Sequence, residues 1–365
     1  MNKYLFKMEQ ETFEESDFLE VPPSDIVAYN ELRSCADLVR MEKEGVLKIK
    51  PEFERNFVWS EAEQTRFVDS LVKQLPIPSM CFSLDYKTQE WQVIDGLQRI
   101  STIIRFLSEE NWILSKLDDI DKKLSGRKVD EIRTDRIDSR QIFARVQNLT
   151  LPITVLRCDY SKPDHANYLF MIFHRLNTGG IKLNNQEIRN CIYTGTFNNL
   201  LRTLDKNEKW RDIHKNKQQN IKRLITQELI LRIFALHDDY KNYGGRLAKF
   251  LNDYMNENKK LSDKECQDKR LLFEETVNTI YDKLFDDAPP DTKLTVTELE
   301  GLFVGVMYNL KKLKQLPSSV LKQRFQKLLD HEEFSDEKLS EGLSGKPRVT
   351  GRIGAAVDIF GEQHK

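Results

Sequence analysis

Residues 91–108 place a short apolar strand directly before an amphipathic helix, with only Asp95 and Gly96 between them. Apolar residues follow at a helical spacing that puts them on one face: Ile100, Ile103, Ile104 and Leu107. Glycine suits the junction because it adopts backbone conformations that a Cβ hinders. This segment therefore predicts mixed α and β structure, with a helix that begins at the end of a strand.

Such a junction is suited to bind an anion. The first N–H groups of a helix have no intrahelical partner, and the partial positive charge at its N-terminus attracts phosphate. Gln98 and Arg99 add side-chain donors at the same place. The alternative is an ordinary Asp-Gly turn followed by an exposed arginine, because this dipeptide is common in turns.

The composition narrows the class of protein. The chain has 365 residues, of which 39% are hydrophobic and 32% charged, so we expect a globular protein with room for two domains. A net charge of −1 argues against nucleic-acid binding over the whole surface. No apolar run suits a signal peptide or a membrane span, which favours a cytoplasmic protein without a membrane role.

The cysteine pattern argues against structural metal or disulfide sites. Five cysteines lie far apart in the sequence, and neither Cys-x-x-Cys nor His-x-x-x-His occurs. We therefore expect reduced thiols and no structural zinc.

Secondary-structure signals change along the chain. Residues 1–29 are predicted to form an acidic N-terminal arm, because residues 9–25 contain seven acidic residues and no basic one. Residues 30–184 mix helix and strand signals, whereas residues 185–365 have helical signals almost throughout. The predicted fold class is therefore α+β, with an α/β domain followed by an all-helical domain.

Local signals place several elements of the first domain. Helices are expected from Ser34 and from a capping box formed by Ser60 and Glu63. The second of these should turn the following side chains inward: Phe67, Val68, Leu71, Val72 and Leu75. Strands are expected at residues 46–49, 80–84, 91–94 and 153–158.

Two other segments suit a site shared with the junction. Arg55 lies in an aromatic-rich stretch before the capping box, where it is able to bind phosphate with two donors. Stacking of Arg55 on Phe57 or Trp59 is an equal alternative. Asn177 opens an Asn-Thr-Gly-Gly loop whose backbone amides suit an anion, although a helix C-cap and turn would have the same sequence.

Several motifs in one order resemble a known family. They are the stretch from Phe53 to Trp59, Pro-Ile-Pro, Val-Ile-Asp-Gly-Leu-Gln-Arg and Arg-Leu-Asn-Thr-Gly-Gly, followed by Gln-Glu-Ile-Arg. Over roughly residues 35–240 the chain resembles the DGQQR-motif proteins, domain-of-unknown-function family 262, which include the GmrS part of GmrSD type IV restriction systems. The resemblance implies a ParB/sulfiredoxin-like nucleotide-binding domain and a nucleoside triphosphate, with or without Mg²⁺.

The resemblance also assigns residues. Asp95, Gly96, Gln98 and Arg99 match the named motif, Arg55 matches an upstream Gln-Arg element, and Asn177 and Glu187 match a later element. The expected nucleotide-binding residues are therefore Arg55, Asp95, Gly96, Gln98, Arg99 and Asn177, with no catalytic or metal-binding residue assigned.

Two positions depart from the family pattern. Leu97 replaces a glutamine that would be able to orient a phosphate, a metal or the attacking water, so binding is a safer inference than hydrolysis. Glu54 replaces another glutamine and would repel a triphosphate unless a metal ion or Arg55 lies between them.

The leading hypothesis is a nucleotide-binding subunit, with or without NTP hydrolysis, of a prokaryotic anti-phage or modification-dependent restriction system. The histidines do not form an HNH signature, so DNA cleavage would belong to a separate HNH nuclease subunit. The alternative is a non-enzymatic ParB-like DNA-binding or scaffolding module that uses nucleotide only as a switch, and Leu97 favours this class. Candidate DNA contacts are the basic residues 206–223 around Trp210 and, more weakly, residues 345–352.

Overall fold

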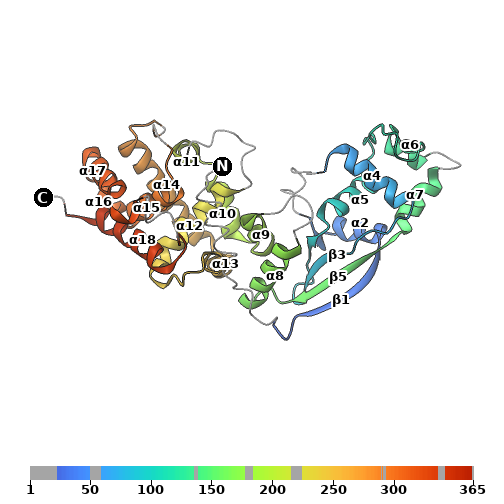
Figure 1. Cartoon of the computed structure of the whole chain (residues 1–365), viewed down its shortest axis with the longest axis horizontal. Helices are drawn as coiled ribbons and strands as arrows, with labels where there is room; N and C mark the ends of the chain where they lie inside the picture. The colour runs from blue at the N-terminus through green and yellow to red at the C-terminus, as the bar shows by residue number, and fades with distance from the viewer. Residues whose placement is uncertain are drawn as a thin grey trace. The chain divides into compact units, whose positions relative to one another are not determined.

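The computed structural model describes residues 23–49, 59–134, 139–176, 184–214, 224–288, 290, 293–335 and 342–363. The chain forms two compact units, one within residues 21–183 and one that includes residues 184–365. The structure belongs to the α+β class, as the sequence predicts (Figure 1). No helix among the described residues has both the length and the apolar character needed to cross a membrane.

A five-stranded mixed sheet forms the centre of the first unit, in the order β1-β5-β3-β4-β2. β1 (Val27–Ser34) runs antiparallel to β5 (Thr150–Cys158), and β5 runs parallel to β3 (Met80–Asp85). β4 (Trp91–Asp95) is antiparallel to β3 and parallel to the short β2 (Leu47–Lys48). Every residue of β3 is buried, which places this strand in the core.

Helices cover this sheet and close its core. They are α2 (Cys35–Lys43), α4 (Glu61–Val72), α5 (Leu97–Ser108), α6 (Val129–Thr134), α7 (Ser139–Asn148) and α8 (Pro163–Leu176). Figure 1 shows α2, α4, α5, α6 and α7 gathered near one another, while α8 packs near β4. Leu38, Phe82, Ile103 and Phe106 lie in this core without any exposed surface.

The helix starts in this unit follow from local sequence. The Ser34 side chain accepts a hydrogen bond from the backbone N–H of Asp37, and Ser60 forms a capping box with Glu63. Both N-caps confirm the prediction. Leu75 was expected to point inward but is 48% exposed, because α4 ends at Val72 and the backbone then turns through a left-handed Gln74.

Strand β1 is absent from the prediction and begins within the segment assigned to the acidic arm. It lies at the edge of the sheet, and most of its side chains are exposed on both faces. A strand of this kind lacks the alternation of buried and exposed residues on which pattern recognition depends.

The second unit is helical throughout its described residues. Its α-helices are α9 (Asn185–Ile192), α10 (Thr196–Leu204), α11 (Glu208–Ile213), α12 (Ile225–Asp239), α13 (Leu247–Asn258), α14 (Asp263–Leu284), α15 (Val296–Tyr308), α16 (Leu310–Leu313), α17 (Ser318–Leu329) and α18 (Lys346–Gly361). Residues 227–236 of α12 are all buried, which confirms the central position expected for an apolar helix.

Helix α18 lies within the part of the chain predicted to be all-helical. It packs against α15, where a Cβ added at Gly305 would lie 2.5 Å from the Phe360 ring. The two helices therefore approach closely at glycines. This packing depends on residues far apart in the sequence, so a local sequence pattern does not predict it.

Candidate anion-binding site

The junction predicted from the sequence is present at the end of β4. The strand ends at Asp95, Gly96 is the N-cap residue, and α5 begins at Leu97. Gly96 has a φ of +96°, and a Cβ at this position would lie 2.5 Å from Cγ of Met80. A larger residue would therefore strain the backbone and displace a buried side chain.

The first turn of α5 is the part of this junction that suits an anion. A glycine N-cap brings no side-chain acceptor, and no side chain among the described residues caps this helix. The first intrahelical bond runs from the N–H of Ile100 to the carbonyl of Gly96, at 2.9 Å. The three preceding N–H groups thus have no intrahelical partner, the arrangement that binds phosphate at helix starts.

Arg99 lies beside these N–H groups, and its guanidinium is held by the protein. Nη2 forms an ion pair of 2.6 Å with Oδ2 of Asp95, and Nη1 donates to the Pro78 carbonyl at 2.5 Å. The side chain is only 15% exposed. Arg99 therefore clamps the start of α5 to the segment before β3, while its charge remains at the helix start.

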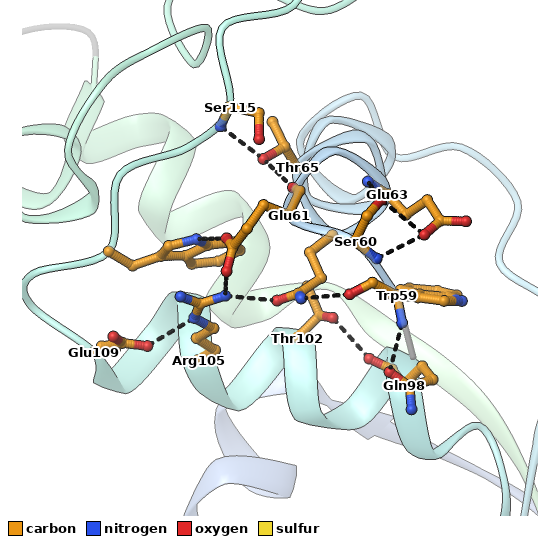
Figure 2. A network of polar contacts seen from close by, with 12 residues as sticks. Trp59, Ser60, Glu61, Glu63, Thr65, Gln98, Thr102, Arg105, Glu109 and Ser115 are labelled. Carbon is orange, nitrogen blue, oxygen red and sulfur yellow. Dashed lines mark hydrogen bonds and ion pairs between the residues drawn. The ribbon is translucent and has the colours of Figure 1, made fainter. Parts of the chain in front are cut away.

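Gln98 also makes contacts within the protein. Its Oε1 accepts a hydrogen bond from the backbone N–H of Trp59 at 3.4 Å, and Nε2 of Gln64 donates to the Trp59 carbonyl at 2.9 Å (Figure 2). Side chains of α5 and α4 thus hold both backbone groups of Trp59. This fixes the residue that precedes the capping box beside the first turn of α5.

Arg105, near the other end of α5, also joins this helix to α4 (Figure 2). Its Nη1 donates to Oε1 of Gln64 at 2.9 Å and to Oε1 of Glu61 at 2.8 Å. Its guanidinium also lies 4.3 Å from the ring centroid of Trp112, which donates to Glu61. Burial raises the pKa of Glu61, but the hydrogen bonds from Arg105 and Trp112 outweigh it, and the pKa lies below its usual value.

This network was not predicted, although the sequence holds one signal for it. Gln64 lies on the same face of α4 as Phe67, Val68 and Leu71, and it is 1% exposed. A polar residue on an apolar helix face needs hydrogen-bond partners. Its two partners, the Trp59 carbonyl and Arg105, connect the start of α4 to the last turn of α5.

Residues 35–194 match the family model described as the GmrSD restriction endonuclease N-terminal domain. This segment, less than half of the chain, is therefore similar to the N-terminal domain of that family. It includes β2 to β5 of the sheet and extends through α9. A comparison with curated protein sequences finds no match.

Four of the six predicted binding residues of this GmrSD-type domain meet at one junction: Asp95, Gly96, Gln98 and Arg99. Arg55 and Asn177 lie outside the described residues. Leu97 is partly buried and packs against the apolar core. This packing accounts for an apolar residue at the position where the sequence resemblance leads us to expect glutamine.

The later motif residues serve the helical unit. Glu187 forms a capping box with Asn184, whose N–H donates to Glu187 Oε2 at 2.7 Å. Arg189 forms a buried ion pair of 2.9 Å with Glu228 on α12. The match of Glu187 to a nucleotide-binding element therefore coincides with a local role at the start of α9.

The basic stretch at residues 206–223 does not offer Trp210 to a nucleic acid. Trp210 is 0% exposed and packs edge-on against Phe273, Phe303 and His214. Lys209 forms an ion pair of 2.5 Å with Asp282, and residues 215–223 lie outside the described residues. The expected interleaving of an aromatic with surface lysines is wrong, because the periodicity of α11 turns this tryptophan inward.

Proposed function

We propose that this protein is the nucleotide-binding subunit of a modification-dependent restriction system, and that a separate nuclease subunit cleaves the DNA. The observation that carries the proposal is the uncapped start of α5 at the end of β4. Its N–H groups and the charge of Arg99 suit the phosphates of a nucleoside triphosphate. The mixed sheet with a strand–glycine–helix junction supports a ParB/sulfiredoxin-like fold for this domain.

The match of residues 35–194 to this family supports the place of the protein in a restriction system. Among the described residues, no group of three or more His, Cys, Asp or Glu side chains is arranged to hold a metal ion. Under this proposal, DNA cleavage belongs to a separate partner of the HNH class.

Asp95 is the residue at the junction that fits a Mg²⁺ ion bound with the nucleotide. Mg²⁺ in nucleotide sites is held by one or two carboxylates together with the phosphates. Oδ2 of Asp95 contacts Arg99, and the side chain is 39% exposed. Its carboxylate is thus accessible next to the N–H groups of α5.

Calorimetry with ATP, GTP, CTP and UTP, each with and without Mg²⁺, tests the proposal. The informative variant is Gln98→Glu, because a carboxylate keeps an acceptor for Trp59 and favours the helix start. The added negative charge would repel phosphate and lower affinity on the order of tenfold or more. Gln267→Glu, the same change at an exposed position of α14, is the control and should bind as the unmodified protein does. No binding of any nucleotide by the unmodified protein would refute the proposal.

A further inference from the structure

Strand β1 lies at one edge of the sheet (Figure 1). Among the described residues it pairs with β5 alone, over eight consecutive residues and without a bulge. Proteins usually protect such edges with lysine, proline, bulges or very short strands. β1 contains no lysine or proline, so its outer N–H and C=O groups form a regular template for another strand.

Apolar exposure concentrates on the same strand. Of the eight large hydrophobic side chains that stand exposed among the described residues, three lie on β1: Val27 at 48%, Tyr29 at 37% and Leu32 at 69%. Val27 and Tyr29 point to one face of the sheet, and Leu32 points to the other. A partner that packed on one face would leave the other exposed. Addition of a strand along the edge covers residues on both faces.

We infer that β1 pairs antiparallel with β1 of a second copy of this chain, with Asn30 opposite Asn30 of the partner subunit. In a symmetric antiparallel pair, the two-fold axis passes a residue that faces its own copy. The axis at Asn30 aligns residues 27–33 and places Tyr29 opposite Glu31, Ala28 opposite Leu32 and Val27 opposite Arg33. No like charges then face each other.

The neighbouring registers are less favourable. An axis at Glu31 sets two carboxylates directly opposite, which is destabilising. An axis at Leu32 aligns only residues 30–34 and involves Ser34, whose side chain caps α2. An axis at Tyr29 aligns only residues 27–31 of the strand, since β1 begins at Val27.

The inference is independent of the nucleotide site. β1 ends at Ser34, and the match to the GmrSD N-terminal domain begins at residue 35. The dimer would join two five-stranded sheets into one continuous sheet across the axis. Light scattering from about 1 to 200 µM should therefore show a mass that rises from monomer to dimer, and Leu32→Lys should shift this rise to higher concentration or abolish it.

Cysteine cross-linking tests the register. Opposite Cα atoms in an antiparallel pair lie about 4.5 to 5.5 Å apart, within the range of a disulfide. Asn30→Cys should therefore give a covalent dimer on mild oxidation. Ala28→Cys alone should not, because its two copies would be about 13 Å apart. Ala28→Cys combined with Leu32→Cys should cross-link again.

The native thiols set the background of this experiment. Four of the five cysteines are buried and Cys266 is partly exposed, so the unmodified protein is oxidised in parallel. Asn30→Ser, which removes the hydrogen bond from Thr154 without adding a thiol, reports the effect of the substitution itself. A monomer at every concentration would overturn the inference, as would equal cross-linking of Ala28→Cys and Asn30→Cys. Dimer formation that Leu32→Lys leaves unchanged would do the same.

Discussion

Asp95 and Arg99 form an ion pair of 2.6 Å that links the last residue of β4 to the first turn of α5. The same guanidinium donates to the carbonyl of Pro78, ahead of β3. The strand, the turn and the helix start are therefore held as one unit. In this protein the motif residues build a helix N-terminus, and the backbone of that helix offers the groups that suit phosphate.

Arg99→Ala should lower the free energy of unfolding by about 1 kcal/mol, because it removes charge-assisted hydrogen bonds to a partly exposed carboxylate and to the exposed Pro78 carbonyl, both of which water is able to replace. Arg99→Lys keeps the positive charge but loses the planar fork, so it should lose stability while it retains part of the nucleotide affinity. Urea unfolding and calorimetry measure the two effects. Equal stability of all three proteins would show that the clamp has no structural role.

Gly96→Ala should cost about 1 to 3 kcal/mol of stability, since it combines a left-handed backbone with a collision against Met80. Gly45 provides the matched control. It also has a positive φ, of +69°, but no atom lies within 4 Å of an added Cβ. Gly45→Ala should therefore show only the backbone cost. Thermal unfolding of both variants would contradict this account if Gly45→Ala were the less stable.

Local chemistry explains what could be predicted of this fold. The glycine between strand and helix, and the caps at Ser34 and Ser60, act within a few residues, so the sequence displays them directly. The partner of Arg99 at Pro78 is 21 residues away in the chain, and that of Gln98 at Trp59 is 39 residues away. Contacts at such separations depend on the packing of whole elements.

In the candidate site, too, the local features could be predicted from the sequence and the long-range contacts could not. Gln98 and Arg99 could be located from the sequence, but the contacts that their side chains make with Trp59 and Pro78 could not. The residues next to Trp210 in the sequence have the basic composition of a surface patch, yet Trp210 itself is buried in the core of the helical unit. The charge of a basic stretch can be read from the sequence. Whether a tryptophan within it is buried depends on which face of the helix packs against the rest of the protein.

Gln64→Leu should destabilise the link between α4 and α5. The change leaves the Trp59 carbonyl and one Arg105 donor without their present partner, at a cost of about 1 to 3 kcal/mol. Hydrogen exchange should become faster in α4 around Gln64 and in α5 around Arg105. Gln326→Leu, which removes an exposed contact with Asp330 in α17, should change stability by no more than about 0.5 kcal/mol. Unaltered exchange in Gln64→Leu would contradict the proposed link.

His214 should make stability depend on pH. Burial lowers the pKa of His214 to about 4, from the ordinary value of 6.5. The unfolded chain therefore binds a proton first as the pH falls. Stability should decrease from about pH 6.5 toward pH 4, by on the order of 1 to 3 kcal/mol, and level off below.

His214→Phe is the control for this pH dependence. It retains a ring beside Trp210, where the two centroids lie 4.8 Å apart, and removes the titrating group. The difference in unfolding free energy between the two proteins should therefore grow as the pH falls. A constant difference between pH 7 and pH 4 would show that another group governs acid sensitivity.

Leu97→Gln tests whether the departure from the family motif decides between binding and hydrolysis. Leu97 packs partly against the core and adds no polar group to the start of α5, so we expect nucleotide to bind with little turnover. A glutamine at this position supplies an amide that is able to orient water or phosphate, and it should raise phosphate release while binding persists. A phosphate-release assay on both proteins, with Gln98→Glu in each background, measures this. Release from the Leu97→Gln protein that Gln98→Glu abolishes would place the reaction at this junction. No release from either protein would favour a module in which the nucleotide acts only as a switch.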